Sequence, residues 1–317
     1  MSAARFWPRT IGMRLLMVAV LLAALIGGGC AELEHKEREL TFRVVPSDAS
    51  WFSGIPAAMQ ELDLPVGVDN SIHAWWWKAE LRDAPTLLYL HGSRWNLTGQ
   101  LYRLQQLHDF GFSILAIDYR GFGKSRGGEP SEKTVYEDAA VGWEELVKLQ
   151  PDPAKRYIYG HSLGGAIAID LAARLSEIAE QAHEPIPAHG LIVESTFTTL
   201  ADIARALSYD WIPFQLIMSQ KFDSLAKIAN VRMPLLVVHG ASDRYVPPRF
   251  SRALYDAATQ PKRLLIVDGG SHNNAMRLGS DEYREALTAL FGLNANVDDR
   301  APASVQQAKV QHATHGD

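Results

Sequence analysis

The sequence predicts an α/β fold in which a mostly parallel sheet is covered by helices on both faces. Apolar runs of strand length alternate with amphipathic helical segments between residues 40 and 293. The runs are continuously apolar, which indicates strands that are buried on both faces, as in parallel sheets. In addition, the pentapeptide Gly-His-Ser-Leu-Gly at residues 160–164 stands between such a run and a helical segment rich in small residues. A serine in this setting occupies a tight strand-to-helix turn.

The composition limits the classes of function that the chain can have. Its 317 residues are 47% hydrophobic and 21% charged, so a sizeable core is expected. The net charge is −5 and the sequence holds no basic cluster, which argues against nucleic acid as a partner. Cys30 is the only cysteine, so an intrachain disulfide is excluded.

The N-terminal segment, residues 1–29, has the pattern of an export signal or a membrane anchor. Arginines precede an apolar run over residues 15–26, and three glycines separate this run from Cys30. This order resembles a bacterial lipoprotein signal, whose cleavage would leave Cys30 as the lipidated N-terminus. An uncleaved anchor helix and an ordinary secretion signal are the alternatives. Each of them places the body of the protein outside the cytoplasm, and the first two attach it to a membrane on its periplasmic or cell-surface side.

Two polar segments flank the expected domain. Residues 30–39 are charged and are expected to form a spacer or a short helix. Residues 294–317 are rich in Ala, Gln and Asp and lack apolar periodicity, which predicts a disordered tail. The α/β domain is therefore expected to extend over residues 40–293.

The expected elements follow one another as strands and helices within this domain. Three consecutive tryptophans, at positions 75–77, should place at least one ring on each side of the sheet, because side chains alternate along a strand. Ser131 is expected to cap the N-terminus of the second helix. The expected strands are residues 40–45, 72–78, 86–90, 113–117, 156–159, 190–193, 235–239 and 263–267, and the expected helices are residues 97–109, 131–149, 166–181, 250–258 and 281–291.

Chemically useful residues follow four of these strands. Ser93 comes shortly after the strand at 86–90, and Ser162 comes after the strand at 156–159. Asp243 follows the strand at 235–239, and His272 follows the strand at 263–267. The carboxyl ends of parallel strands meet at one edge of a sheet, so these residues are expected to converge there. Ser162, Asp243 and His272 follow one another along the chain in the order nucleophile, acid and base.

The blocks around these residues resemble those of the α/β-hydrolase superfamily. Within it, the chain is similar to serine hydrolases related to the membrane-associated abhydrolase-domain proteins and to the monoglyceride-lipase or aminopeptidase-like proteins. The resemblance covers about residues 40–293 and implies an α/β-hydrolase fold with an eight-stranded, mostly parallel sheet and a Ser-Asp-His triad. It rests on five blocks in the expected order: Leu90-His91-Gly92, residues 118–125 (DYRGFGKS), residues 160–164 (GHSLG), residues 239–247 (HGASDRYVP) and Gly270-Ser271-His272.

The chemistry assigns a role to each member of this set. Ser162 would attack an acyl carbonyl, His272 would take and return the proton, and Asp243 would hold the imidazole. The N–H of Leu163, directly after the nucleophile, is one expected oxyanion donor. The resemblance implies that the N–H of Ser93 is the other. This chemistry requires no metal and no organic cofactor.

Other residues compete for some of these roles. Glu194 also follows a strand and is the alternative acid, although Asp243 matches the family block and is favoured. His91, His161 and His239 lack partners at the spacing of metal ligands, so no metal site is expected. Asp268, four residues before His272, is interpreted as a strand-end residue.

The segment at about residues 197–230 is expected to form a small helical lid. It is rich in apolar and aromatic residues, which favours a small-molecule ester or thioester with an apolar, lipid-like acyl group as the substrate. The plainer interpretation is that these residues pack on the sheet. Cleavage of an amide or peptide bond is the alternative reaction, and a non-catalytic, membrane-tethered binding protein is the alternative class.

Overall fold

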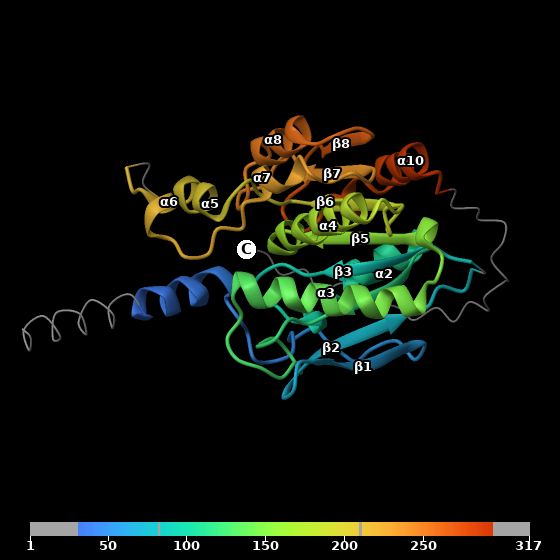
Figure 1. Ribbon diagram of the computed structural model, residues 1–317, viewed down its shortest axis with the longest axis horizontal. Helices are drawn as coiled ribbons and strands as arrows, with labels where there is room; N and C mark the ends of the chain where they lie inside the picture. The colour runs from blue at the N-terminus through green and yellow to red at the C-terminus, as the bar shows by residue number, and fades with distance from the viewer. Residues whose placement is uncertain (1–30, 82, 209–210, 294–317) are drawn as a thin grey trace, which may run out of the picture.

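The eight-stranded sheet at the centre of the molecule confirms the predicted fold class. The computed structural model describes residues 31–81, 83–208 and 211–293. Within them the strands follow the spatial order β1-β2-β4-β3-β5-β6-β7-β8 (Figure 1). Their bounds are β1 Met59–Val66, β2 Asn70–Trp77, β3 Thr86–Leu90, β4 Ser113–Ile117, β5 Arg156–His161, β6 Gly190–Glu194, β7 Leu235–Gly240 and β8 Lys262–Val267.

Most of the sheet is parallel, and the two N-terminal strands form its antiparallel edge. β1 pairs with β2 and β2 pairs with β4 in antiparallel register. The pairs β4·β3, β3·β5, β5·β6, β6·β7 and β7·β8 are all parallel. The carboxyl ends of β3, β5, β6, β7 and β8 therefore lie along one edge of the sheet, on the left in Figure 1.

Helices cover both faces of this sheet. One apolar core joins the strands to α3, α4 and α8, and the other joins them to α2, α9 and α10. α3 begins with a capping box in which the Ser131 side chain accepts from the N–H of Thr134, as predicted for this N-cap. The helices are α2 Leu101–Asp109, α3 Glu132–Leu149, α4 Leu163–Ala182, α5 Leu200–Ala206, α6 Phe214–Ile217, α7 Ser224–Ile228, α8 Arg249–Ala257, α9 Ala275–Leu278 and α10 Ser280–Phe291, with 3₁₀ turns at Leu97–Gly99 and Pro153–Lys155.

The three tryptophans of β2 divide between these two cores. Trp75 and Trp77 are buried in the core on the α2 and α10 side, whereas Trp76 packs against the core on the α3 and α4 side. This alternation confirms that the tryptophans serve core packing on both faces of a strand.

The predicted strand at Leu40–Val45 is wrong. Residues 31–42 form a helix, and residues 43–46 have no regular secondary structure. Of the two alternatives for the charged residues, a spacer or a short helix, the helix applies to residues 31–39, and Leu40 belongs to the same helix. The strand that was not predicted is β1, an edge strand in which apolar and polar side chains alternate and which is half-buried.

The predicted signal or anchor at residues 1–29, the predicted lipidation site Cys30 and the predicted tail at residues 294–317 all lie outside the described residues. Among the helices that the structure does describe, none combines the length and the apolar character needed to cross a bilayer.

The segment predicted as a lid contains α5, α6 and α7. Part of it packs on the body of the protein, since Phe197, Phe222 and Ile228 are buried in the core beside α3 and α4. The part around α6 extends beyond the carboxyl edge of the sheet, on the same side as the helix of residues 31–42 (Figure 1). The plainer interpretation therefore applies to the part that packs on the body of the protein, and a lid over Ser162 stays a prediction for the part around α6.

Candidate active site

Ser162 occupies a strained turn between β5 and α4. Its φ of 55° and ψ of −120° are sparsely populated by non-glycine residues. The turn is held by its neighbours, because the N–H of Ser162 donates to the Glu194 carbonyl and the Thr196 hydroxyl donates to the Ser162 carbonyl. This conformation projects the Ser162 hydroxyl away from the backbone.

The glycines on either side of Ser162 allow this turn to form. A Cβ at Gly160 would lie 2.2 Å from the Gly164 carbonyl oxygen, and a Cβ at Gly164 would lie 2.0 Å from the Leu90 carbonyl oxygen. Both contacts are impossibly short, so any side chain at either position would force the strand and the helix apart. The spacing of the pentapeptide is thus a steric requirement of the elbow.

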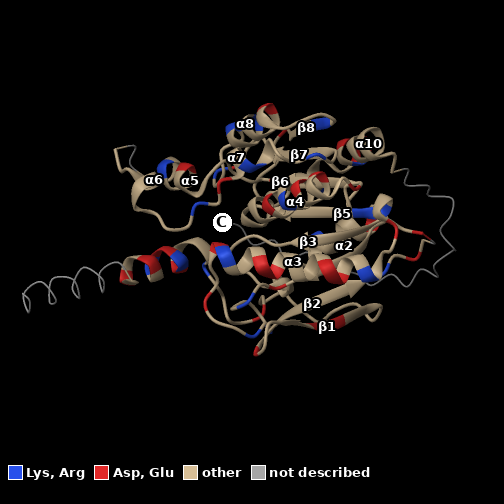
Figure 2. Cartoon of the chain, viewed as in Figure 1, with Lys and Arg blue, Asp and Glu red and all other residues tan. Residues whose placement is uncertain are grey.

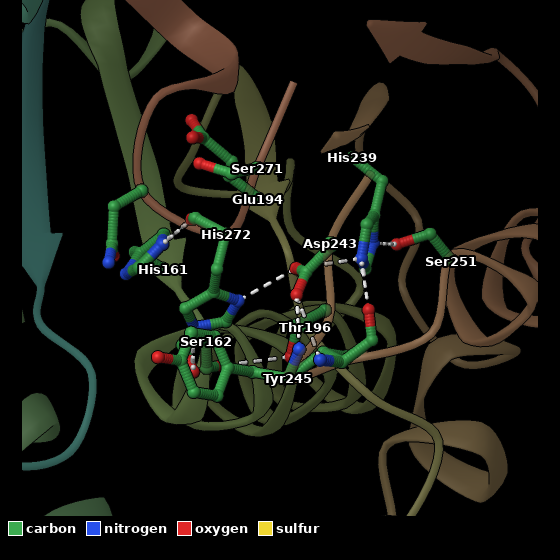
Figure 3. Close-up of polar contacts among 12 residues, drawn as sticks. His161, Ser162, Glu194, Thr196, His239, Asp243, Tyr245, Ser251, Ser271 and His272 are labelled. Atoms are coloured by element: carbon green, nitrogen blue, oxygen red, sulfur yellow. Dashed lines mark hydrogen bonds and ion pairs between the residues drawn. The ribbon is translucent and has the colours of Figure 1, made fainter. Parts of the chain in front are cut away.

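The structure brings Ser162, His272 and Asp243 together as predicted (Figure 3). His272 Nε2 lies 3.1 Å from Ser162 Oγ, and His272 Nδ1 lies 2.7 Å from Asp243 Oδ2. With the proton on Nδ1, His272 donates to the carboxylate and its Nε2 lone pair accepts from the serine hydroxyl. This is the geometry of a nucleophile, a general base and an orienting acid.

Asp243 is held as a carboxylate by donors on both sides. Burial would by itself raise its pKa, but hydrogen bonds from His239 and His272 outweigh burial and lower the pKa of Asp243 far below its ordinary value. The N–H groups of Tyr245 and Val246 donate to Oδ1 at 2.8 and 2.9 Å. Asp243 is therefore ionised at neutral pH and can stabilise a positive charge on His272.

His239 is a second imidazole on Asp243 that sequence reasoning considered only as a metal ligand. Its Nε2 lies 3.1 Å from Asp243 Oδ2 and 2.8 Å from the Val246 carbonyl, and its Nδ1 lies 2.6 Å from Ser251 Oγ. A neutral ring with its proton on Nε2 satisfies all three contacts. The four-residue spacing between His239 and Asp243 was the signal that could have revealed this contact.

Glu194, the alternative acid, has different partners. Its Oε1 accepts from Arg103 Nη1 at 2.6 Å, and its Oε2 accepts from the Tyr159 hydroxyl at 2.8 Å. Glu194 and Arg103 are both completely buried. The structure therefore places Asp243, and not Glu194, against the imidazole of His272.

Two hydrogen bonds fix the turn that carries His272. His161 Nε2 lies 2.9 Å from the His272 carbonyl, and Arg103 Nη2 lies 3.3 Å from the Asn273 carbonyl. Burial, followed by the positive charge of Arg103 and by the neighbouring His272, lowers the pKa of His161 well below its ordinary value. His161 is therefore a neutral donor at this position.

The predicted oxyanion donors lie on segments that meet at Ser162. A Cβ built on Gly92 would lie 3.1 Å from the Ser162 Cβ, so the turn that carries Ser93 packs directly against the nucleophile. Leu163 is the first residue of α4, where backbone N–H groups have no helical acceptor. Among the described residues, no group of three or more His, Cys, Asp or Glu side chains is arranged to hold a metal ion.

Family models match two overlapping parts of the chain. The model described as serine aminopeptidase, S33 matches residues 84–201, and the model described as serine hydrolase (FSH1) matches residues 146–273. Together the two matches include Ser162, Asp243 and His272.

Several curated proteins are similar to this chain over about two thirds of its length. An uncharacterized protein of Mycobacterium tuberculosis is 33% identical over 204 residues, which are 64% of this chain and 68% of that protein. The uncharacterized protein YfhR of Escherichia coli is 31% identical over 208 residues, with the same coverage. The lysophosphatidylserine lipase ABHD12 of Danio rerio is 31% identical over 232 residues, which are 64% of this chain and 58% of that lipase.

Solved structures share the fold at low sequence identity. The Pyrococcus furiosus esterase Pf2001 superposes with a TM-score of 0.59 at 18% identity, covering 78% of this chain and 99% of the esterase. An alpha-beta hydrolase from Vibrio vulnificus superposes with a TM-score of 0.60 at 22% identity, covering 74% of this chain and 82% of that protein. At these identities the likeness concerns the arrangement of the chain.

Proposed function

This chain belongs to the α/β-hydrolase superfamily of serine hydrolases, and we propose that it cleaves carboxylic or thio esters of apolar, lipid-like acyl groups through an acyl-enzyme on Ser162. The observation that carries the proposal is the continuous contact from Ser162 Oγ through His272 to Asp243. A serine next to a neutral imidazole that is itself oriented by a carboxylate is an activated nucleophile.

The geometry performs the reaction in two halves. Ser162 Oγ attacks the acyl carbonyl carbon while its proton moves to His272 Nε2, and Asp243 stabilises the resulting imidazolium. The tetrahedral oxyanion accepts hydrogen bonds from the N–H groups proposed at Leu163 and Ser93. Collapse of this intermediate expels the alcohol or thiol, which takes the proton from His272. Water then repeats the sequence on the acyl-enzyme and releases the carboxylic acid and free Ser162.

Two features support an apolar substrate. The part of residues 197–230 around α6 is rich in apolar residues and extends beyond the carboxyl edge of the sheet, the edge at which Ser162 lies (Figure 1). In addition, the lysophosphatidylserine lipase ABHD12 of Danio rerio is 31% identical to this chain, and the chain spans 58% of that protein. A lysophospholipid or monoacylglycerol would present one acyl ester at such a site.

The proposed setting of the enzyme is the outer side of a membrane. The basic, apolar and glycine-rich order of residues 1–30 supports export and attachment of a lipid to Cys30. Metabolic labelling with a palmitate analogue tests this part of the proposal. Wild type should be labelled and Cys30→Ser should not, and continued labelling of the variant would exclude lipid attachment at Cys30.

A fluorophosphonate probe tests the nucleophile. Wild type should be labelled covalently, and Ser162→Ala should lose at least 99% of the labelling, because the probe forms its bond with an activated serine. Ser242→Ala, which changes a serine on the neighbouring β7 loop, is the matched control. Equal labelling of wild type and Ser162→Ala would show that catalysis does not occur at Ser162.

A panel of substrates separates the ester from the amide reaction. Amide cleavage is the second candidate because the family model that matches residues 84–201 is described as a serine aminopeptidase. p-Nitrophenyl esters with acyl chains of two to sixteen carbons, a thioester and an aminoacyl p-nitroanilide would be compared by kcat/KM. We expect the highest values for the longer acyl esters, and a higher value for the anilide would reverse the proposal.

A further inference from the structure

The helix of residues 31–42 is joined to the segment after α6 by one glutamate. Glu37 accepts hydrogen bonds from the N–H and the hydroxyl of Ser219 and from the N–H of Gln220, each at 2.8 Å. The ring of Phe42, five residues later, packs edge-on against Phe222. These contacts fix the helix to residues 219–222, which follow α6.

Four apolar side chains surround this junction and remain exposed. Leu33 and Leu40 lie four residues before and three residues after Glu37, so all three side chains share one helical face. On the other side of the junction, Leu216 and Ile217 precede Ser219 by three and two residues. The exposed fractions are 56% for Leu33, 68% for Leu40, 84% for Leu216 and 50% for Ile217. We call these four residues the junction patch.

The position of the patch along the chain indicates what covers it. The described part of the helix, residues 31–42, directly follows Cys30 and the apolar run of residues 15–26 in the sequence, and residues 1–30 lie outside the described residues. A lipid on Cys30, or an uncleaved anchor in residues 1–29, would therefore also hold the helix and α6 close to the membrane. α6 has no charged residue (Figure 2). In the helix, Glu34 pairs with Arg38 and Glu39 pairs with Lys36, so each of these four charges has an opposite charge beside it near a lipid surface.

We propose that the junction patch docks onto the surface of a phospholipid bilayer, so that the helix of residues 31–42 and α6 present the active-site edge of the sheet to lipid. The proposal rests on the esterase and membrane attachment proposed above. Exposed leucine and isoleucine side chains gain free energy when they leave water for the acyl-chain boundary of the bilayer.

The docked helix is also connected to the loop beside the nucleophile. The Arg94 N–H donates to the Phe42 carbonyl at 2.8 Å, and the Val45 N–H donates to the Arg94 carbonyl at 3.0 Å. Arg94 directly follows Ser93, the predicted oxyanion donor. Docking of the helix would therefore hold the loop that carries Ser93, and with it the carboxyl edge of the sheet, at the lipid surface.

Hydrolysis in vesicles compared with hydrolysis in solution tests the proposal. The full chain would be reconstituted into phosphatidylcholine vesicles, and the double variant Leu216→Ser, Ile217→Ser would be compared with wild type. For a long-chain lysophospholipid in the same vesicles we expect kcat/KM to fall about tenfold, because two apolar contacts with lipid are lost. For p-nitrophenyl acetate in water we expect no change. Ile178→Ser is the control, because Ile178 is 62% exposed and lies near the C-terminal end of α4, the end opposite Ser162.

Fluorescence locates the patch independently of catalysis. Leu216→Trp and Ile178→Trp would each be reconstituted with brominated phosphatidylcholine, and the quenching would be compared with that of wild type. We expect added quenching for Leu216→Trp and none for Ile178→Trp. Equal quenching of the two variants, or unchanged hydrolysis of the vesicle substrate by the double serine variant, would overturn the docking proposal.

Two further outcomes have separate meanings. Wild type that hydrolyses neither ester contradicts the proposed function, while the quenching experiment still tests docking. A double serine variant that changes from dimer to monomer in detergent, together with absent quenching of Leu216→Trp, would assign the patch to a second copy of this chain and overturn docking onto lipid.

Discussion

Two buried carboxylates lie at the ends of neighbouring parallel strands and have opposite surroundings. Asp243, after β7, contacts two imidazoles, those of His272 and His239. Glu194, at the end of β6, contacts the guanidinium of Arg103 and the hydroxyl of Tyr159. Both strands end at the active-site edge. From the sequence alone, either carboxylate is therefore a candidate for the acid of the triad.

The difference shows that the partner decides what each carboxylate does. An imidazole can gain and lose a proton near neutral pH, so the carboxylate beside it stabilises a charge that appears during the reaction. Arg103 keeps its charge throughout: burial by itself would lower its pKa, but Glu194 and the neighbouring tyrosines together outweigh burial and raise the pKa of Arg103 well above its ordinary value. Glu194 therefore compensates a permanent charge, and its contribution is to folding and to the position of the Asn273 carbonyl.

The largest expected effect is on catalysis at Asp243. In Asp243→Asn the amide group cannot stabilise an imidazolium and can donate to Nδ1, which favours the wrong tautomer of His272. We expect kcat to fall about 10⁴-fold with the fold intact. The measurement is steady-state hydrolysis of p-nitrophenyl acetate, with circular dichroism to confirm folding. Retention of more than one tenth of the wild-type kcat would remove Asp243 from the triad.

The second expected effect is on stability at Glu194. Glu194→Gln leaves the buried guanidinium of Arg103 without its countercharge, which should lower the free energy of unfolding by about 3–5 kcal/mol. In the folded protein at low temperature, kcat should stay within about tenfold of wild type, because the Asp243–His272 contact is unchanged. Urea denaturation measures the first quantity and ester hydrolysis measures the second.

A matched double variant sharpens this result. In Arg103→Met, Glu194→Leu both charges are replaced by apolar side chains, so no buried charge is left unpaired. We expect this variant to be more stable than Glu194→Gln. A fully stable Glu194→Gln that has lost kcat about 10³-fold would reverse the comparison and make Glu194 the acid.

The sequence predicts the triad well because its geometry follows from topology. Ser162, Asp243 and His272 each come after a parallel strand, and such strands place their carboxyl ends along one edge. The strain at Ser162 also follows from local sequence, since glycines at 160 and 164 are required by close backbone contacts. Inferences of this kind need only the order of elements and short-range sterics.

Long-range partners and segments of ambiguous pattern could not be predicted in the same way. Arg103 lies 91 positions before Glu194, so no local spacing connects them. The apolar residues of Leu40–Val45 look like a short strand, but the contacts of Glu37 and Phe42 with the lid segment favour a helix that ends at residue 42. Both outcomes depend on tertiary contacts that the sequence does not display.

The smallest expected effect is at His161, which lies between the two carboxylate regions. Its pKa is lowered by burial first, then by the charge of Arg103 and by the neighbouring His272, so it responds to both regions. Above about pH 6.5 neither the folded nor the unfolded state protonates this imidazole. Below that pH the unfolded state binds a proton that the folded state does not, so stability is lost as the pH falls.

Replacing His161 with glutamine should remove this pH dependence while the amide still donates to the His272 carbonyl. Between pH 6.5 and pH 5 the slope of the unfolding free energy against pH should decrease by up to about 1.4 kcal/mol per pH unit, which corresponds to one proton. Urea denaturation at a series of pH values measures the slope, with the exposed His183→Gln as the matched control. An unchanged slope in His161→Gln would show that His161 accepts a proton in the folded state. It would also show that burial and the charge of Arg103 do not keep this imidazole neutral.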